Sequence, residues 1–466
     1  MMQSFKWTLK VATAAALLAG ASTAAMADWR DDWKAFAAAT GDAGHAKWVE
    51  QISTPEARKL DADWAAFRGY DASTLIAAQK DLPPELKPGL IINKDNVGQF
   101  PWLAKYLPDF WIQRLNSEWF NTGQIRIVPT SHYYMQASML EATKAIAPGS
   151  LLVNDKAELV NASGELAVLK TPGLPFTMPK NGGELNWLQT LHGVGVDDLY
   201  FNPIYMTACD SNNKPERNYV GQIWWRRMAG RTDDAPLGNI GIAPGAYEAG
   251  ALLFTEPNDV RGLAGVRIRY AAADRDDDFK VFIPSLRRTR VLAGTNGQDP
   301  LAAGMEVAWD EWRSTWMKND GRLYEYTMEP DAFILAMPET GHAYDPLTLT
   351  ENRCGAQNVD MELRPAWVLD IKDKTGTYQY SHKRIHVDKE LYYTQYQEAY
   401  DPSGKLYRVW DDSRDFDPST GRMMWKNAMV ANVISNRVNT LTMNADWEGR
   451  KTMNNALFDI DQLRSR

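Results

Sequence analysis

From about residue 125 onward, apolar and polar side chains alternate along many short segments, and turn-forming residues separate one segment from the next. Residues 266–270 and 279–283 both alternate in this way, and the acidic stretch 274–278 lies between them. Successive side chains of a β-strand point to opposite faces of a sheet, so this period of two predicts two strands. The short turn between them predicts a hairpin.

Similar alternation elsewhere predicts a sheet of many strands. Residues 158–169 indicate another hairpin around the turn Asn161-Ala162-Ser163-Gly164. After residue 365 we expect an antiparallel meander, with strand segments at 367–371, 378–380, 391–397 and 406–410. A sheet of this extent twists and curls, so a half-barrel is expected rather than a flat sheet.

The N-terminal region, residues 28–124, is expected to be mainly helical. Trp29, Trp33 and Phe36 recur at spacings of four and three, which places them on one face of a helix. Residues 55–80 show a similar pattern. These helices are the natural cover for the apolar face of the sheet.

Together these patterns predict an α+β protein, in which a large curved antiparallel sheet (a half-barrel) is wrapped around helices. Residues 125–466 would form the curved β region and, with the helices, one elaborated domain. A second small domain over residues 171–250, which are rich in Pro, Gly and Asn, remains an alternative.

Residues 1–27 have the organisation of a cleavable signal peptide. Lys6 and Lys10 precede an apolar stretch over residues 11–21, and Ala25-Met26-Ala27 matches the small-x-small pattern that signal peptidase recognises. The stretch is about a dozen residues long, short of the roughly 20 that a spanning helix needs. We therefore expect cleavage after Ala27 and a periplasmic protein that does not span the membrane.

The net charge of the chain limits the kinds of partner that it can bind. The formal net charge is −8 at pH 7, and loss of Lys6 and Lys10 with the signal peptide makes it −10. A surface of this sign repels nucleic acid, so no nucleic-acid partner is expected. The first mature residue would be Asp28 rather than Cys, so no lipid anchor is expected either.

The chain contains two cysteines, Cys209 and Cys354. In an oxidising compartment such a pair can form a disulfide, and it can equally remain as two buried thiols. The spacing leaves both outcomes open.

Motifs of catalysis or cofactor binding are missing from the sequence, including G-x-S-x-G, the P-loop, the dinucleotide fingerprint, C-x-x-C-H and H-E-x-x-H. His382 and His386 are the most closely spaced histidines, but on a strand their rings would be roughly 13 Å apart, too far for one metal ion. The acidic stretch 274–278 lacks the glycine and the distal glutamate of an EF-hand. We expect no catalytic residue, no metal and no cofactor.

Aromatic residues are abundant, with 18 Trp, 19 Tyr and 14 Phe. Their wide apolar surfaces and polar tips suit the lining of a ligand cavity in a curved sheet, although a dry core would use them equally well. Tyr270 and Phe279 lie on the two strands of the predicted hairpin at 266–283 and are candidate contacts for a hydrophobic ligand.

Three arginines follow this hairpin within four positions, at Arg287, Arg288 and Arg290. Such a cluster suits a carboxylate, a phosphate or the acidic surface of a partner. The alternative interpretation pairs these arginines with the aspartates of the acidic stretch 274–278 as structural salt bridges.

Three segments resemble a known family. Residues 85–97 (ELKPGLIINKDNV), 254–262 (FTEPNDVRG) and 284–288 (PSLRR) are similar to recurrent blocks of domain-of-unknown-function family thirteen-twenty-nine. Its members are exported proteins of similar length, often labelled outer-membrane lipoprotein-sorting-like. The chain departs from the family at Thr289-Arg290, where members usually carry another Arg pair, and an acidic pair of the family corresponds here to Asp310-Glu311.

That family is similar in fold to the lipoprotein carriers LolA and LolB, whose curved sheet encloses a cavity for acyl chains. The resemblance implies a carrier of hydrophobic cargo in envelope transport, and the absence of a lipid anchor makes the shuttling LolA the better comparison. Two alternatives remain: a carbohydrate-active hydrolase with paired carboxylates, and an assembly partner of an envelope transporter or an outer-membrane barrel.

Overall fold

The computed structural model describes residues 28–115, 123–192, 195–212, 214–292, 297–311, 317–340, 354 and 358–465. The predicted signal peptide lies outside these residues. The described α-helices are α1 (Trp29–Thr40), α2 (Ala43–Ile52), α3 (Pro55–Arg68), α4 (Ala72–Ala77), α5 (Asp109–Leu115), α6 (Ala137–Lys144), α7 (Gly182–His192) and α9 (Ile460–Leu463).

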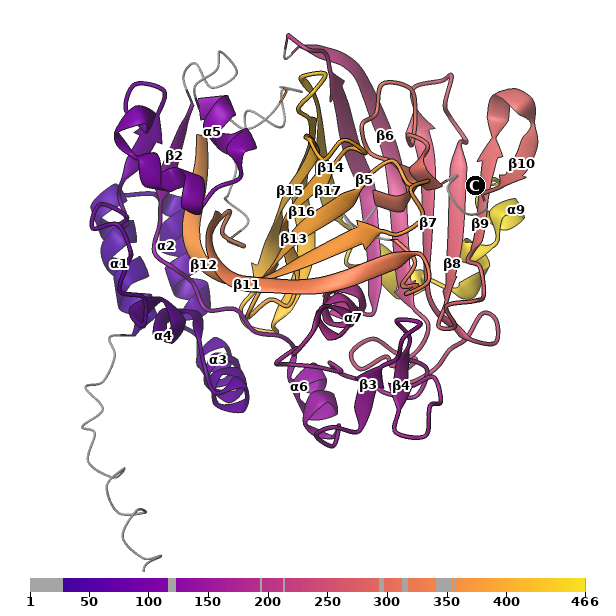
Figure 1. The fold of residues 1–466 in the computed structure, drawn as a ribbon, viewed down its shortest axis with the longest axis horizontal. Coiled ribbons are helices and arrows are strands. Elements are labelled where there is room, and N and C mark those ends of the chain that lie inside the picture. The colour runs from indigo at the N-terminus through magenta and orange to yellow at the C-terminus, as the bar shows by residue number, and fades with distance from the viewer. Residues whose placement is uncertain are drawn as a thin grey trace, which may run out of the picture.

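Helices α1 to α4 lie together at one side of the molecule, beside β2 and β12 (Figure 1). Each begins at a residue whose side chain accepts a hydrogen bond from an amide of the first turn, and these residues are Asp28, Asp42, Thr54 and Asp71. The apolar faces of α1, α2 and α3 carry large buried tryptophans, which lie in the main hydrophobic core with the sheet residue Phe416. Local capping therefore starts these helices, and burial of aromatic side chains holds them in place.

The described strands are β1 (Ile91–Asn93), β2 (Gln124–Ile127), β3 (Leu151–Val153), β4 (Leu159–Asn161), β5 (Asp198–Cys209), β6 (Pro215–Arg227), β7 (Ala246–Glu256), β8 (Ala264–Tyr270), β9 (Asp278–Ile283), β10 (Arg288–Val291), β11 (Tyr324–Ala336), β12 (Asn358–Asp373), β13 (His382–Asp388), β14 (Thr394–Tyr400), β15 (Leu406–Asp417), β16 (Arg422–Asn432) and β17 (Arg437–Ala445). Strands β3 and β4 form a small separate sheet, and the others form one large sheet.

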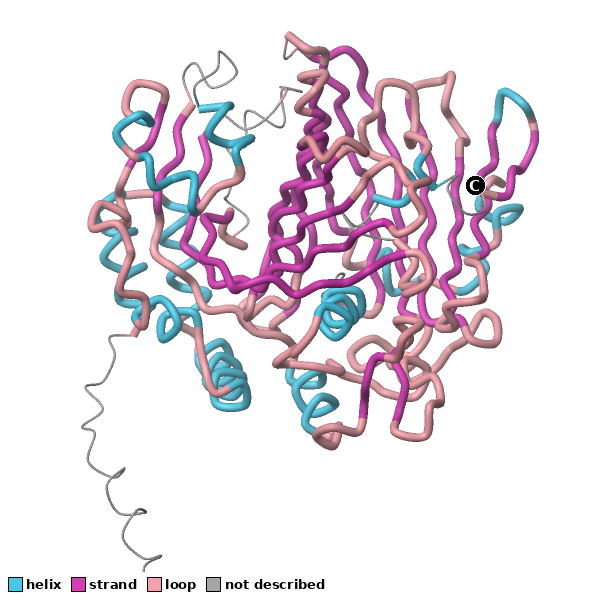
Figure 2. Tube along the Cα trace, in the orientation of Figure 1, coloured by secondary structure: helices cyan, strands magenta, loops and turns pink. Residues whose placement is uncertain are grey.

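The order of the large sheet is β1-β2-β12-β13-β14-β15-β16-β17-β5-β6-β7-β8-β9-β10, and β11 also pairs with β12. Its described pairs are antiparallel except β2 with β12, which is parallel. Figure 2 shows the strands as a strongly curved wall, and the sheet does not close into a barrel. The predicted fold class, an α+β protein with a large curved antiparallel sheet, is confirmed.

The local predictions differ in their outcome. The hairpin predicted at 266–283 is present as β8 and β9, with Val266 opposite Lys280. In the segment 158–169, β4 instead pairs with β3, and the predicted return strand is reduced to a bridge between Val160 and Leu166. The strand predicted at 378–380 is wrong, because β13 begins only at His382.

Residues 297–311 cover the inner face of the central strands. Leu301 and Val307 pack there with side chains of β5, β6, β7, β15, β16 and β17. Trp309 lies so close to Gly265 on β8 that a Cβ at Gly265 would come within 2.3 Å of its ring. The absence of a side chain at Gly265 therefore lets this segment pack directly on the sheet.

The opposite face of β6, β7 and β8 is covered by the C-terminal end of the chain. Leu457, Phe458 and Leu463 pack against Trp224 and Val266 in a separate apolar cluster. Both faces of these strands are therefore buried in protein.

A network of buried charges joins the N-terminal helices to the sheet. The Arg364 guanidinium is fully buried on β12 and donates to Asp388 Oδ2 (2.7 Å), to Glu390 Oε2 (2.9 Å) and to the Ser131 carbonyl. Glu390 in turn accepts from the Arg68 guanidinium of α3 (3.3 Å) and from the Ala72 amide of α4 (2.9 Å). Two strands and two helices are thus tied to one set of carboxylates.

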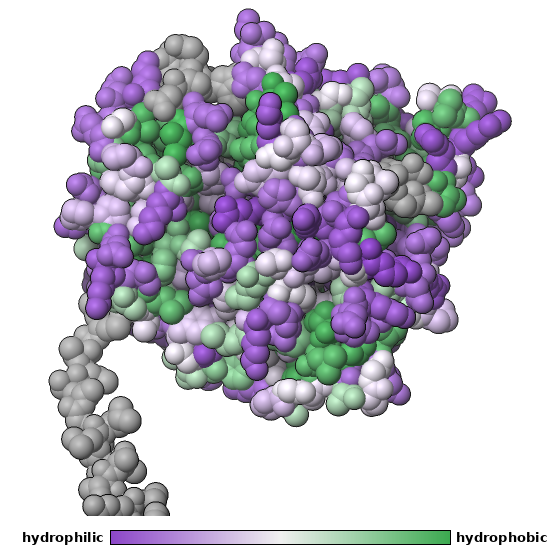
Figure 3. Space-filling model, in the orientation of Figure 1, coloured by the Kyte–Doolittle hydropathy of each residue, from purple (hydrophilic) through white to green (hydrophobic). Residues whose placement is uncertain are grey.

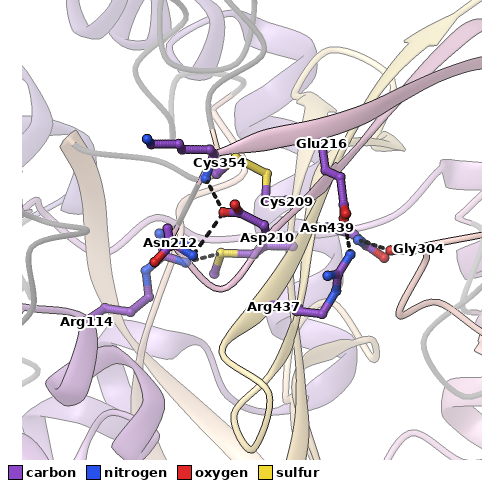
Figure 4. Close-up of a disulfide and its surroundings, with 11 residues drawn as sticks. Arg114, Cys209, Asp210, Asn212, Glu216, Gly304, Cys354, Arg437 and Asn439 are labelled. Carbon is purple, nitrogen blue, oxygen red and sulfur yellow. Dashed lines mark hydrogen bonds and ion pairs between the residues drawn. A yellow bond between two sulfur atoms is a disulfide. The ribbon is translucent and has the colours of Figure 1, made fainter.

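Cys209, the last residue of β5, forms a disulfide with Cys354 (Figure 4). The two Cα atoms are 5.8 Å apart, and both residues are buried. Near this bond Arg437 of β17 pairs with Glu216 of β6. The disulfide closes a loop with a sequence separation of 145.

We predict that loss of the disulfide lowers stability by about 2–5 kcal/mol, because a long loop loses its constraint in the unfolded chain. The Cys209→Ser/Cys354→Ser double variant should melt at a lower temperature than the wild type. Dithiothreitol should lower the Tm of the wild type and leave that of the double variant unchanged. An unchanged wild-type Tm together with two titratable thiols would contradict the bond.

Candidate functional site

A cavity of about 480 Å³ lies between the β8–β9 hairpin and the end of β11 and β12. Arg267 of β8 and Phe279 of β9 form one side, and Tyr324 of β11 forms another. Asp373 at the end of β12 and Tyr378 after the following turn complete the lining. The volume falls in the range of small-molecule sites, roughly 300–1,000 Å³.

Part of the wall is apolar and aromatic. Phe279, Leu292, Leu323, Tyr324 and Tyr378 line it. The rings of Tyr324 and Tyr378 meet edge to face with centroids 5.9 Å apart, so they hold one another in position. This wall offers a rigid surface to an apolar ligand.

The rest of the wall is charged and internally paired. Arg267 donates from Nε to Asp277 Oδ2 (3.0 Å) and from Nη1 to Asp310 Oδ1 (2.8 Å). Asp277 also accepts from Arg269 Nε (3.1 Å) and lies 3.5 Å from Lys318 Nζ. Burial alone would raise the pKa of Asp277, but Arg269, Arg267 and Lys318 lower it to about 2. Burial lowers the pKa of Lys318.

The lining as a whole has an excess of negative charge. It contains five carboxylates, Asp276, Asp277, Asp310, Asp320 and Asp373, and three cations, Arg267, Lys318 and Arg322. Arg322 pairs with Asp320 at 2.6 Å. The excess of two carboxylates favours a ligand whose polar end is neutral or cationic.

The centre of the inner face does not offer comparable space. Ten apolar side chains from the sheet and from residues 297–311 surround a space of about 20 Å³ there. That volume is close to what one water molecule requires, so no acyl chain fits. Ligand-sized space lies instead between the two ends of the curved sheet.

The structure separates the residues that the sequence placed in one candidate site. Phe279 lines the cavity. Tyr270 is buried outside the lining, and its hydroxyl donates to Asp278 Oδ2 (2.7 Å). Arg287, Arg288 and Arg290 lie exposed at the β9–β10 end of the sheet and do not line the cavity.

The alternative interpretation of these arginines as structural salt bridges has no support in the described part of the chain. Asp277 is paired with Arg267, Arg269 and Lys318 instead. No described carboxylate forms an ion pair with Arg287, Arg288 or Arg290.

Sequence reasoning missed most of the charged wall. Arg267 and Arg269 alternate with apolar residues on β8, a pattern that indicates a solvent-facing side. Because protein covers both faces of β8, these arginines are buried and need acidic partners. The one indication in the sequence of these buried ion pairs is the acidic pair Asp310-Glu311, since Asp310 is a partner of Arg267.

The histidines noted in the sequence do not form a metal site. His382 Nδ1 lies 2.6 Å from Asp370 Oδ1, and burial lowers the pKa of His386 to about 4. Within the described residues, no group of three or more His, Cys, Asp or Glu side chains is arranged to hold a metal ion. Among the described helices, none is both long and apolar enough to cross a membrane.

The fold and the cavity define a class: an α+β protein whose large, open, curved antiparallel sheet carries a cavity of about 480 Å³ between its two ends. The chain belongs to the family described as "Protein of unknown function (DUF1329)", whose model matches residues 91–464. The family resemblance seen in the sequence is confirmed. No curated protein matches the chain.

The solved structures that are similar to the chain include the following three, all at low identity. A domain from Vibrio parahaemolyticus, named for outer membrane lipoprotein sorting, shares 14% identity over 60% of this chain and 97% of its own, with a TM-score of 0.43. A DUF1329 family protein from Desulfovibrio piger shares 14% over 60% and 98%, with a TM-score of 0.42. A LolA superfamily protein from Nitrosomonas europaea shares 13% over 61% and 99%, with a TM-score of 0.37.

We predict that Asp277→Asn destabilises the protein by about 3–5 kcal/mol at pH 7, because it removes the buried carboxylate charge that Arg267, Arg269 and Lys318 share. The folded pKa of Asp277 is below its ordinary value of 3.8, so its contribution is present above pH 3.8 and is lost as the pH falls through about 2. Urea unfolding monitored by tryptophan fluorescence measures the change.

The neighbouring variant Asp276→Asn is the matched control, since Asp276 is exposed. Its effect should stay within about 0.5 kcal/mol. Equal stability of the two variants would show that the buried pairs around Asp277 contribute nothing.

Proposed function

We propose that the protein binds a lipid-like or other hydrophobic small molecule in the cavity between β8–β9 and β11–β12 and transfers it within the periplasm, without covalent chemistry in that cavity. The observation that carries the proposal is a cavity of about 480 Å³ whose lining combines aromatic side chains with charged groups. Such a site takes an amphipathic molecule, with the apolar part against Phe279 and Tyr378.

The energy of apolar burial is sufficient for this role. Each buried methylene contributes about 0.8 kcal/mol, so ten would contribute roughly 8 kcal/mol before ordering costs, which corresponds to micromolar affinity. The excess of carboxylates around Arg267 and Lys318 disfavours an anionic headgroup. A neutral or cationic amphiphile therefore fits better than a free fatty acid.

The arginine cluster serves a different step in this proposal. Arg288 and Arg290 lie on an edge strand, β10, and Arg287 directly precedes it; the backbone of β10 pairs only with β9 among the described strands. An edge strand with exposed cations suits docking to the acidic surface of a partner, such as an envelope transporter or an outer-membrane barrel. The cluster would act on delivery rather than on ligand affinity.

A carbohydrate-active hydrolase is the second candidate, because the cavity combines carboxylates with aromatic side chains. Glycoside hydrolysis requires one carboxyl group with a raised pKa as the acid. The pKa values of the lining residues Asp277 and Asp373 are instead lowered. A turnover assay on glycans discriminates, since a carrier shows none.

We predict that Phe279→Ala weakens binding of a fluorescent neutral lipid analogue about tenfold, because it removes aromatic surface worth about 1–3 kcal/mol. Phe282→Ala is the matched control, since Phe282 lies on the same strand and packs on the opposite face of the sheet. Fluorescence titration measures both affinities, and native mass spectrometry of gently purified protein tests for a retained ligand. A protein that retains no ligand and binds no lipid analogue would contradict the carrier proposal.

We predict that Arg287→Ala/Arg288→Ala slows ligand transfer to acceptor membranes or to a partner while leaving the Kd for a neutral ligand unchanged, because rim charges act mainly on encounter. Raising the salt concentration should slow the wild type in the same way. The control Arg261→Ala removes an exposed arginine from another turn. A change in Kd with unchanged transfer would contradict this assignment.

A further inference from the structure

A second pocket of about 330 Å³ opens at the surface of the N-terminal helices and shares no lining residue with the cavity described above. Residues of α1, α3 and α4 and of the loop before α6 line it. Its wall includes Trp29, Arg58, Asp61, Ser73 and His132. In the view of Figure 3, the surface around the N-terminal helices, at the left, carries mixed polar and apolar patches.

Three of these side chains form a relay. Ser73 Oγ lies 2.7 Å from His132 Nε2, and His132 Nδ1 lies 3.3 Å from Asp61 Oδ1. This is the order and spacing of a nucleophile, a general base and the carboxylate that orients the base. The contacts come from α3, α4 and the loop after β2, so chain folding brings them together.

The carboxylate of the relay is held firmly. Asp61 Oδ2 accepts from Trp29 Nε1 (3.0 Å) and from Arg30 Nη2 (2.7 Å), which leaves Oδ1 for His132. Burial alone would raise the pKa of Asp61, but His132, Trp29 and Arg30 lower it to about 2, so the group stays ionised. The His132 ring stacks on Trp29 with centroids 4.9 Å apart. Trp29 and Arg30 are thus positioning residues.

The nucleophile combines access with a fixed backbone. Asp61 and His132 are buried, whereas Ser73 is only half-buried and lines the pocket. The preceding amide, that of Ala72, donates to the buried Glu390 Oε1 (2.9 Å). The Ser73 hydroxyl therefore faces an open pocket from a backbone that is anchored to the sheet.

We propose that Ser73, His132 and Asp61 form a hydrolytic site for short-chain carboxylic esters. Two of the three residues precede the segment that matches the family, residues 91–464, so the site depends on the N-terminal helices of this chain. The pocket is smaller than the cavity described above, which favours a short acyl group. Arg58 lies on the same wall with its Nη1 paired to Asp28 Oδ2 (2.8 Å), and its half-exposed guanidinium supplies the cation for the tetrahedral oxyanion in this proposal.

The reaction needs only water as co-reactant. Ser73 Oγ bonds to the ester carbonyl carbon while His132 Nε2 takes the hydroxyl proton. When the tetrahedral adduct collapses, the bond to the alkoxy group breaks and the alcohol departs with that proton. Water then loses a proton to His132 and attacks the acyl-Ser73 ester, and the proton returns to Ser73 Oγ. The products are a carboxylic acid and an alcohol.

The protonation state of His132 gives a further readout. The ring faces Asp61, Asp71 and Glu390, with Arg30 behind Asp61. Burial would lower the pKa of His132, but the three carboxylates raise it above 6.5. Because the base must be neutral, the rate of hydrolysis should rise as the pH increases through this raised pKa and then reach a plateau.

The test uses the full-length protein with p-nitrophenyl acetate as substrate and a fluorophosphonate as covalent probe. We expect a phosphonyl adduct on the peptide that contains Ser73, and a loss of hydrolysis of at least about 100-fold in Ser73→Ala at unchanged Tm. Ser53→Ala is the matched control, since Ser53 is also half-buried on the helical layer but lies outside the pocket. It should retain both labelling and hydrolysis.

Asp61→Asn tests the relay without touching the nucleophile. It should lower the rate and move the pH profile to lower pH, because His132 loses its main anionic neighbour. Equal hydrolysis by the wild type and Ser73→Ala, or a wild type that is not labelled at Ser73, would overturn the proposal. Lipid-analogue binding by Ser73→Ala is unaffected in either case. The hydrolytic site and the lipid-binding cavity are therefore tested independently of one another.

Discussion

The guanidinium of Arg364 lies in the interior of the protein, where its charge has to be balanced by other protein groups. Asp388 and Glu390 supply that balance, and Glu390 also binds Arg68 and the amide of Ala72. Removing one of these charged partners would leave the remaining buried charges incompletely balanced. The positions of β12, β13, α3 and α4 are therefore set by one electrostatic requirement. The rest of the N-terminal layer, including its open pocket, depends on it.

The curved sheet creates an inner face, and the chain fills the centre of that face with its own residues 297–311. A small-molecule volume remains at the seam where the two ends of the sheet approach, between β8–β9 and β11–β12. This seam is lined from sequence-distant elements, so its shape depends on how far the sheet curls.

Local patterns predicted local structure. The β8–β9 hairpin followed from alternation and a short acidic turn, both of which are properties of neighbouring residues. The same rule failed at Tyr378 and Tyr380, whose alternation reflects hydroxyls that donate to Asp310 and Glu311 rather than a strand. It also could not show that Arg267 is buried, because a period of two does not tell what covers each face. Ser73, His132 and Asp61 carry no sequence motif, since only tertiary packing brings them together.

The order of strands in the sheet differs from their order in the chain. Val438 of β17 pairs with Cys209 of β5, and Met361 of β12 pairs with Ile127 of β2. One edge of β5 therefore stays unpaired until β17 has been synthesised, and one edge of β2 stays unpaired until β12 has been synthesised. Loop closure over such separations is entropically costly, so folding of this chain is slow compared with that of a protein built from local contacts. A partly synthesised chain exposes the edges of β5 and β2, and these are the places where it would associate wrongly with other chains.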